Sequence, residues 1–336
     1  KINNKSISDI VQISEGVYTP LTGFMSMKEV ETVLLDDKLL TGDAWSLPII
    51  LQASEEEVKK LPNSGEVILL DENSHNPVGI INIQAIEEFK TERFIKSWFG
   101  TDDYNHPGLK EIINNGKYII SGKSYLFDSY RNLIKKHHEY SPKQTREIFY
   151  HNGWYNIVGF HTRNIPHTGH EYIQLKALEL SNSDAILLSP VTGIKKDGDF
   201  NSEIIMMCYQ KLINKGIYKP KGALLSGFNT YSRYAGPREA IFTAICRKNF
   251  GCNNFIIGRD HTGVGSFYPM NASQKIFDRI DLGMEILSFE TAFYCATRDI
   301  VTSNFKDSKY EKSRLNISAT IIRESLRNSE EIPPHL

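Results

Sequence analysis

The sequence predicts an α/β protein whose β-rich N-terminal region precedes a parallel sheet flanked by helices. Short apolar runs alternate with polar turns up to about residue 140, whereas short apolar runs alternate with helical patterns from about residue 141 to 290. Strands that form continuous apolar runs are typical of parallel sheets buried on both faces. We therefore expect domains at 1–140, 141–290 and 291–336, the last being a short tail.

The N-terminal region shows the pattern of a small, barrel-like β domain with added helices. Strands are expected at 66–70, 78–83, 118–120 and 125–127. The first two flank a polar turn and predict a hairpin. The last two flank Ser121, Gly122 and Lys123, which predict a second turn. Residues 27–35 predict a short helix.

The central region shows the alternation expected of a parallel sheet. Strands are expected at 155–160, 185–188, 222–225 and 255–257, and helices at about 169–181 and 237–250. Pro237 suits the first position of its helix, and Gly251 suits the residue after its last turn. In the tail, Ser318 predicts the N-cap of a helix that runs to Arg327.

Composition excludes several classes of protein. Lys plus Arg is 39 and Asp plus Glu is 40, so the net charge of −1 disfavours a dedicated nucleic-acid binder but allows a local anion pocket. The four cysteines form no C-x-x-C pair, which predicts reduced thiols in a cytoplasmic protein and no zinc site. No apolar run reaches about 18 residues, so we expect no membrane span. The N-terminus shows no signal-peptide pattern.

The segment HTRNIPHTGH, residues 161–170, links an expected strand to an expected helix, where α/β proteins bind ligands. His167 and His170 are three residues apart, so both side chains can face the same way. Helix N-termini attract phosphate, and Gly169 allows the backbone to approach a ligand closely. Arg163 supplies a permanently charged guanidinium with several N–H donors that suit an oxyanion. The segment predicts a nucleotide site, with a metal-binding histidine pair or an ordinary polar loop as alternatives.

Three further segments carry candidate chemistry. GRDHTGVG, residues 258–265, predicts an anion cradle, or else a glycine-rich turn with an Arg259–Asp260 ion pair. Residues 233–240 predict a helix start with an internal charge network between Arg238 and Glu239. Residues 192–199 contain a lysine pair that suits a solvated turn and a phosphate contact equally well.

These segments, in this order, resemble the ATP sulfurylase (sulfate adenylyltransferase) family over essentially the whole chain. The family patterns are Q-T-R-N-P followed by H-x-x-H, G-R-D-H-A-G-x-G and Y-A-G-P-R-E-A. The chain keeps 162–164, 258–261 and 234–240 of these, and its residues 18–25 and 317–323 resemble S-P-L-x-G-F-M and I-S-G-T-x-x-R. The resemblance implies a PUA-like β-barrel domain, a Rossmann-like HIGH-superfamily nucleotidyltransferase domain and a small C-terminal α/β domain.

The resemblance also implies roles for individual residues. Catalytic roles fall on Thr162, Arg163, Asn164, His167 and His170. Nucleotide-binding roles fall on His161, Thr162, Arg163, Asn164, Gly258, Arg259, Asp260, His261 and Val301. Sulfate-binding roles fall on His161, Arg163 and Thr262. Positive charge is thus expected to be local, on two arginines and four histidines: Arg163, Arg259, His161, His167, His170 and His261.

The chain departs from the family where the acceptor anion binds. His161 replaces a Gln and Thr262 replaces an Ala, so the identity of the acceptor stays open. The resemblance implies ATP, sulfate, pyrophosphate and adenosine 5′-phosphosulfate as substrates and products. It also implies Mg²⁺ brought by ATP with no protein-held metal, a homo-oligomer, and no nucleic-acid or membrane partner. The alternatives are nucleotidyl transfer to another oxyanion or phosphorylated metabolite, and a non-catalytic PUA-type RNA-binding protein.

Overall fold

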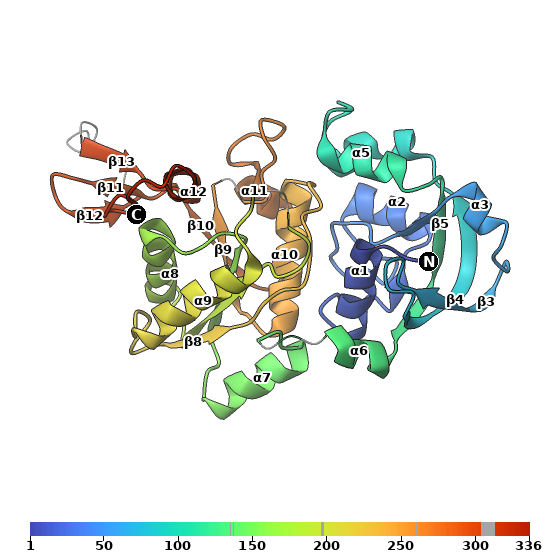
Figure 1. Ribbon diagram of the computed structural model, residues 1–336, viewed down its shortest axis with the longest axis horizontal. Helices are drawn as coiled ribbons and strands as arrows, with labels where there is room; N and C mark the ends of the chain where they lie inside the picture. The colour runs from blue at the N-terminus through green and yellow to red at the C-terminus, as the bar shows by residue number, and fades with distance from the viewer. Residues whose placement is uncertain (135, 137, 196–197, 260, 304–312) are drawn as a thin grey trace. The chain divides into compact units, whose positions relative to one another are not determined.

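The structure is a computed structural model (Figure 1) that describes all residues except 135, 137, 196–197, 260 and 304–312. The chain divides into two compact units, each built from several stretches of sequence. Unit 1 comprises residues 1–146, 229–251 and 260–283. Unit 2 comprises residues 147–228, 252–259 and 284–336. The chain therefore passes repeatedly from one unit to the other.

The described helices are spread over both units. The α-helices are α1 (Asn4–Ser14), α2 (Met27–Asp36), α3 (Glu55–Val58), α4 (Ile95–Phe99), α5 (Pro107–Asn114), α6 (Asp128–Ile134), α7 (Pro142–His151), α8 (Thr168–Leu180), α9 (Ser202–Asn214), α10 (Pro237–Phe250), α11 (Ala272–Lys275) and α12 (Ala319–Arg327). Two 3₁₀ helices are η1 (Thr91–Arg93) and η2 (Ile276–Arg279).

The described strands form three sheets. The strands are β1 (Gly23–Phe24), β2 (Leu51–Ala53), β3 (Gly65–Leu70), β4 (Pro77–Glu88), β5 (Tyr118–Leu126), β6 (Ile157–Thr162), β7 (Ala185–Pro190), β8 (Gly222–Leu225), β9 (Asn254–Gly258), β10 (Glu285–Phe289), β11 (Phe293–Cys295), β12 (Ile300–Thr302) and β13 (Arg314–Asn316). β1–β5 lie in unit 1, and β6–β13 lie in unit 2.

Unit 1 contains an antiparallel sheet in the order β1-β5-β4-β3, with β2 also paired to β5. The expected hairpin is confirmed, since β3 and β4 pair antiparallel. The expected turn at 121–123 is wrong, because β5 continues through it as one strand. Gly122 lies beside a register shift in β4, and a Cβ there would stand 2.0 Å from the Asn82 carbonyl oxygen. This glycine thus permits close strand approach rather than a chain reversal.

Unit 2 contains a parallel sheet in the order β10-β9-β6-β7-β8. The four strands expected from apolar runs are confirmed as β6, β7, β8 and β9. β10 was not predicted, because it lies at the edge of the sheet and carries exposed Glu285 and Ser288 among its apolar residues. Its sequence therefore lacks the continuous apolar run of a central strand.

One face of this sheet is covered by α8 and α9. Ala177 and Leu178 of α8 belong to the same buried cluster as Val158 of β6 and Leu188 of β7. Tyr209 of α9 joins that cluster. The cluster fixes α8, and therefore its N-terminus, against the strands that end beside it. Figure 1 shows α8 next to the small sheet β12-β11-β13, which belongs to the same unit.

The predicted helix ends are confirmed. α10 begins at Pro237, and Gly251 follows it in the left-handed conformation with φ +103°. The side chain of Ser318 accepts a hydrogen bond from the Ile321 N–H and caps α12. All four cysteines are free thiols. Among the described helices, none has the length and apolar character that crossing a membrane requires.

Candidate active site

The loops that follow β6, β7 and β9 begin at one edge of the parallel sheet of unit 2. Thr162 is the last residue of β6, opposite Pro190 of β7, and Gly258 is the last residue of β9. Among the described residues, a Cβ on Gly258 would meet nothing within 4 Å, so this strand end faces open space with respect to them. His161 precedes Thr162, and its ring lies edge-on to Phe228 with centroids 6.3 Å apart. The sheet therefore brings the expected site segments to its carboxyl edge.

Thr162 and Asn164 form a tight turn at the end of β6. The Asn164 N–H donates to Oγ1 of Thr162 at 3.1 Å, and Thr162 is only 7% exposed. The Thr162 carbonyl accepts from the Val191 N–H at 2.8 Å, which joins this turn to the loop after β7. The Thr162 side chain is thus engaged with the main chain. This contact shapes the loop, and the expected nucleotide-binding role of Thr162 stays a prediction.

The rings of His167 and His170 stack at the start of α8. Their centroids are 3.7 Å apart and their planes are inclined by 19°. His167 is the N-cap, and its Nδ1 accepts from the His170 N–H at 3.2 Å. Accepting at Nδ1 leaves the proton of a neutral His167 ring on Nε2, which becomes the free donor. The expectation that both side chains face the same way is confirmed.

Both rings are neutral near pH 7 in the ligand-free protein. Burial lowers the pKa of His167 to about 4. Burial and, secondarily, the His167 charge lower the pKa of His170 well below its ordinary value. The expected local positive charge at this loop therefore resides on Arg163, which is partly buried.

Asn164 is held by a residue that we did not place in the site from the sequence. Nη2 of Arg323, on α12, donates to Oδ1 of Asn164 at 3.2 Å. The Arg323 guanidinium also lies over the Phe200 ring, 5.4 Å from its centroid. Because Oδ1 is occupied, the Asn164 amide is left with its two N–H donors for a ligand. The only sequence signal for Arg323 was its place in the I-S-G-T-x-x-R resemblance.

The α8 N-terminus is more crowded than its sequence predicts. A Cβ on Gly169 would stand 3.1 Å from Ile317 and 3.2 Å from Nδ1 of His167. The Thr168 N–H donates to the Leu336 carbonyl at 3.0 Å. Gly169 therefore permits close packing within the protein, and its expected role in close backbone approach to a ligand stays a prediction.

The second expected segment is divided between the units. Gly258 and Arg259 lie in unit 2, and Nε of Arg259 is buried without a partner among the described residues. Asp260 lies outside the described residues. Val301 lies on β12, which packs against α8, and Ser303 just beyond this strand is 3.4 Å from the Tyr172 hydroxyl. The structure thus associates Val301 with the helix that carries the histidine pair.

His261 and Thr262 belong to unit 1. Nε2 of His261 lies 3.2 Å from Oγ1 of Thr243, and burial together with the charge of Arg247 lowers the pKa of His261 to about 3. Thr262 adopts φ +58°, a strained value for a β-branched residue, and its hydroxyl donates to the Gly236 carbonyl at 2.7 Å. The Thr262 side chain is thus committed to the main chain of its own unit.

The expected Arg238–Glu239 network is wrong. Nη1 of Arg238 pairs with Asp37 at 2.7 Å. Glu239 accepts from two main-chain N–H groups, those of Arg233 at 2.9 Å and Ala235 at 3.2 Å. These carboxylate contacts fix the turn that precedes α10. The arginine and the glutamate are adjacent in sequence, but they point to different partners.

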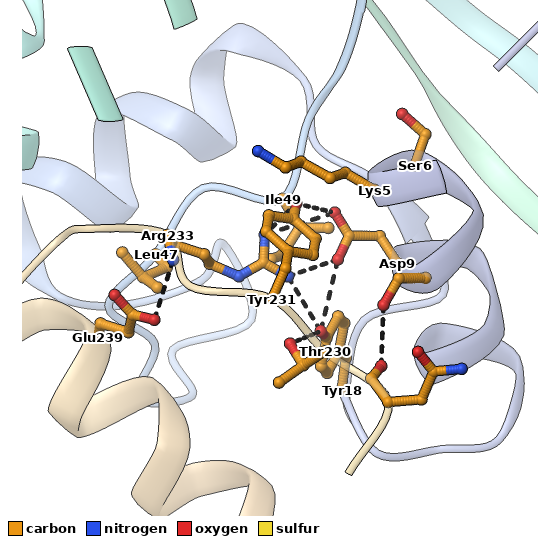
Figure 2. A network of polar contacts seen from close by, with 12 residues as sticks. Lys5, Ser6, Asp9, Tyr18, Leu47, Ile49, Thr230, Tyr231, Arg233 and Glu239 are labelled. Carbon is orange, nitrogen blue, oxygen red and sulfur yellow. Dashed lines mark hydrogen bonds and ion pairs between the residues drawn. The ribbon is translucent and has the colours of Figure 1, made fainter. Parts of the chain in front are cut away.

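Arg233 forms a buried ion pair with Asp9, which Figure 2 shows together with the surrounding hydroxyl groups. The Tyr231 hydroxyl donates to Oδ2 of Asp9 at 2.9 Å, and Nη2 of Arg233 donates to the Tyr18 hydroxyl at 2.9 Å. This cluster joins α1 to the segment before α10 within unit 1. It therefore makes the Y-A-G-P-R-E-A region a structural element of that unit.

Among the described residues, no group of three or more His, Cys, Asp or Glu side chains is arranged to hold a metal ion. The stacked His167–His170 pair has no third ligand of this kind among those residues.

Comparisons with known proteins decide the family. The family model described as ATP-sulfurylase matches residues 136–336, which is more than half of the chain. This chain belongs to the ATP-sulfurylase family. A second family model, described as PUA-like domain, matches residues 1–129 of this chain. The expected fold, a PUA-like region followed by an α/β nucleotide-binding region, is confirmed.

Curated relatives extend the likeness over nearly the whole chain. The sulfate adenylyltransferase of Trichormus variabilis is 36% identical over 339 residues, covering 99% of this chain and 85% of the relative. That of Pyrococcus abyssi is 36% identical over 338 residues, covering 100% of this chain and 86% of the relative. A solved structure titled hexameric APS kinase from Thiobacillus denitrificans has a TM-score of 0.70 at 17% identity and covers 100% of this chain and 59% of its own. This last likeness concerns the fold alone.

Proposed function

We propose that this chain is a sulfate adenylyltransferase. A sulfate oxygen attacks the α-phosphorus of ATP in line, the bond from that phosphorus to the bridging oxygen breaks, and pyrophosphate leaves with the bond's electron pair. Sulfate is already a dianion near pH 7, so no general base is required. Positioning and charge neutralisation are the tasks left to the protein. The observation that carries this proposal is the gathering of Arg163, Asn164, His167 and His170 at the carboxyl edge of the parallel sheet.

Arg163 holds the acceptor oxyanion, because its guanidinium is permanently charged and forked. The Asn164 amide and Nε2–H of His167 donate to phosphate oxygens, since their other polar atoms are engaged by Arg323 and by the His170 N–H. His167 and His170 stabilise the charge that develops on the leaving pyrophosphate. Thr162 acts by shaping the turn that presents Arg163 and Asn164.

Nucleotide-binding roles for four further residues rest on the motif that they share with the family. These residues are Gly258, Arg259, Asp260 and His261. The open space above Gly258 and the unpartnered Nε of Arg259, judged among the described residues, support the role of the first two. Val301 is assigned to the adenine through its main chain. Mg²⁺ enters as the complex with ATP, coordinated by phosphate oxygens and water.

A cytoplasmic location and a homo-oligomeric state form part of the same proposal. The free cysteines support a reducing compartment. Size-exclusion chromatography with light scattering tests the assembly, and a monomeric mass at micromolar concentration would contradict it. Fractionation of cells that express the full chain tests the location.

The acceptor is tested by sulfate-dependent exchange of labelled pyrophosphate into ATP, with selenate, phosphate and phosphorylated metabolites in parallel. His161 and Thr262 replace residues that contact sulfate in the family, so His161→Gln restores the family residue at one of these positions. We expect exchange with sulfate in the unaltered protein, and a changed KM for sulfate without a changed KM for ATP in His161→Gln. An exchange rate that does not depend on sulfate but depends on another oxyanion would instead support the alternative acceptor.

A further inference from the structure

Lys195 carries a buried ammonium group without a hydrogen-bond partner among the described residues. It lies in the loop after β7, one of the strands that end at the carboxyl edge of the unit 2 sheet. Burying a charged donor without a partner costs free energy, and a bound acceptor would remove that cost. The lysine pair of this loop left two interpretations open, a solvated turn and a phosphate contact. A buried Nζ contradicts the solvated turn for Lys195.

The loop of Lys195 runs beside the loop of Arg163. The Val191 N–H donates to the Thr162 carbonyl at 2.8 Å, so the chain after β7 is tied to the end of β6. Arg163 lies in the loop after β6, and Lys195 lies in the loop after β7. The Arg163 guanidinium acts electrostatically on the Lys195 ammonium and disfavours its charged form.

Among the described residues, Asp199 and Arg327 supply further charged groups at the loop of Lys195. Asp199, on the same loop, is the carboxylate that acts on its ammonium. From α12, Nη2 of Arg327 lies 2.6 Å from where a Cβ on Gly198 would stand. Burial is the largest influence on Lys195 and, with the like charge of Arg163, outweighs Asp199 and lowers the pKa of Lys195 to about 8. The ammonium is therefore still mostly protonated at pH 7.

Two more unpartnered donors surround the same edge. Nε of Arg259, beyond β9, and Nε of Arg323, on α12, are buried without partners among the described residues. Three buried donor atoms of Lys195, Arg259 and Arg323 therefore have no acceptor among the described residues. A ligand with several acceptor oxygens and a negative charge is the chemistry that would satisfy them.

We propose that Lys195 is a further anion-binding residue of this site, and that its ammonium and the Arg163 guanidinium share one tetrahedral oxyanion. The proposal deepens the adenylyl-transfer function proposed above and rests on it for the identity of the anions. Two sources supply the same chemistry: the acceptor sulfate, and a phosphate group of ATP or pyrophosphate. In such a site the lysine ammonium supplies a compact positive charge, and the arginine guanidinium supplies several N–H donors in a fixed plane.

The test compares Lys195→Met and Lys195→Arg with a control, Lys211→Met, which removes an exposed lysine of α9. Pyrophosphate exchange gives KM for sulfate and for pyrophosphate, and calorimetry with inorganic pyrophosphate alone measures binding without turnover. We expect Lys195→Met to raise KM for one anion about tenfold or more, as for a lost charge-assisted hydrogen bond. A raised KM for sulfate would show that Lys195 binds the acceptor sulfate. A raised KM and weaker binding for pyrophosphate would show that Lys195 binds a phosphate group. Lys211→Met should change neither value.

Two readouts separate a ligand contact from a packing role. KM for the shared anion should rise above about pH 8 in the unaltered protein and stay flat in Lys195→Arg, because arginine does not lose its proton there. Lys195→Met should keep or raise the thermal midpoint without anions, because it removes an unsatisfied buried charge. If Lys195→Met does not fold, the pH profile of Lys195→Arg decides.

The outcomes distinguish this proposal from the proposed function. Values within twofold of the unaltered protein for both anions in Lys195→Met, with normal exchange, overturn the role of Lys195 and leave the function standing. If the unaltered protein shows no sulfate-dependent exchange, the proposed function fails. In that case calorimetry with pyrophosphate, and thermal shifts with sulfate, still compare the Lys195 variants: equal responses overturn the anion site, and a weaker response of Lys195→Met supports it.

Discussion

Arg323 of α12 donates from Nη2 to Oδ1 of Asn164, 3.2 Å away and 159 residues earlier in the chain. The bond fixes which end of the Asn164 amide can face a ligand, because an oxygen that accepts from arginine leaves the N–H groups to donate outward. We therefore expect Arg323 to act through Asn164 as a positioning residue. The C-terminal helix would then contribute to a candidate site that also includes the loops after β6, β7 and β9.

The first prediction follows from this bond. Arg323→Met should lower kcat in pyrophosphate exchange by about tenfold, since misplacing a catalytic donor by a fraction of an ångström to an ångström is costly. Asn164→Ala should lower kcat further, and kcat of the double variant should be no lower than that of Asn164→Ala alone. Glu324→Gln, an exposed change on the same helix, is the control. Effects that add in the double variant would show that Arg323 does not act through Asn164.

The second prediction concerns Arg163. Arg163→Ala should reduce kcat/KM for sulfate by about 10²–10³, the usual cost of one preorganised donor to developing charge. Arg163→Lys should recover only part of the loss, because an ammonium lacks the forked geometry. Initial rates at varied sulfate concentration check both variants. Near-normal turnover of Arg163→Ala would contradict its assignment as the oxyanion ligand.

The third prediction concerns acid stability. The pKa of His167 is about 4 in the folded chain, below its ordinary value, so only the unfolded chain takes up the proton between about pH 6.5 and pH 4. Stability is therefore lost as pH falls through this window, by at most about 1.4 kcal/mol per pH unit for this residue. His167→Asn keeps an N-cap acceptor and should flatten the decline. Urea unfolding at several pH values measures the slope, and an unchanged slope would oppose a neutral His167.

The fourth prediction concerns the buried pair of Arg233 and Asp9. Removing one partner leaves an unpaired buried charge, so Arg233→Met should lower the free energy of unfolding of unit 1 by about 3–5 kcal/mol. Replacing Asp9 by leucine in the same protein should restore part of that loss. Lys59→Met, which breaks an exposed pair with Glu55, should leave the free energy of unfolding almost unchanged. A double variant as unstable as the sum of both singles would contradict the pairing argument.

The fifth prediction concerns metal removal. EDTA should abolish pyrophosphate exchange, and added Mg²⁺ should restore it, because the metal arrives with the nucleotide. The thermal midpoint of the ligand-free protein should not change with EDTA. A fall in the midpoint would reveal a structural metal, and exchange that persists in EDTA would contradict the role of MgATP.

The parallel sheet and its binding edge were predictable because strand burial and helix caps are local properties of the sequence. Continuous apolar runs predicted β6, β7, β8 and β9, and Pro237 with Gly251 predicted the ends of α10. β10 escaped prediction because an edge strand mixes polar and apolar residues. The turn predicted at Gly122 was wrong because a glycine that permits close strand approach has the same sequence signature as a turn glycine.

The sequence by itself determined the residue types of the candidate site and their order, since the three-residue spacing of His167 and His170 is enough to place both rings on one side of a helix start. Only the tertiary structure decided their electrostatic state, because a lowered histidine pKa depends on burial by distant chain segments. It also decided the surroundings of three side chains: Arg323 donates to Asn164, Asp37 rather than Glu239 pairs with Arg238, and the Lys195 ammonium is buried. Such pairings join residues far apart in the chain, and nothing in local spacing encodes them.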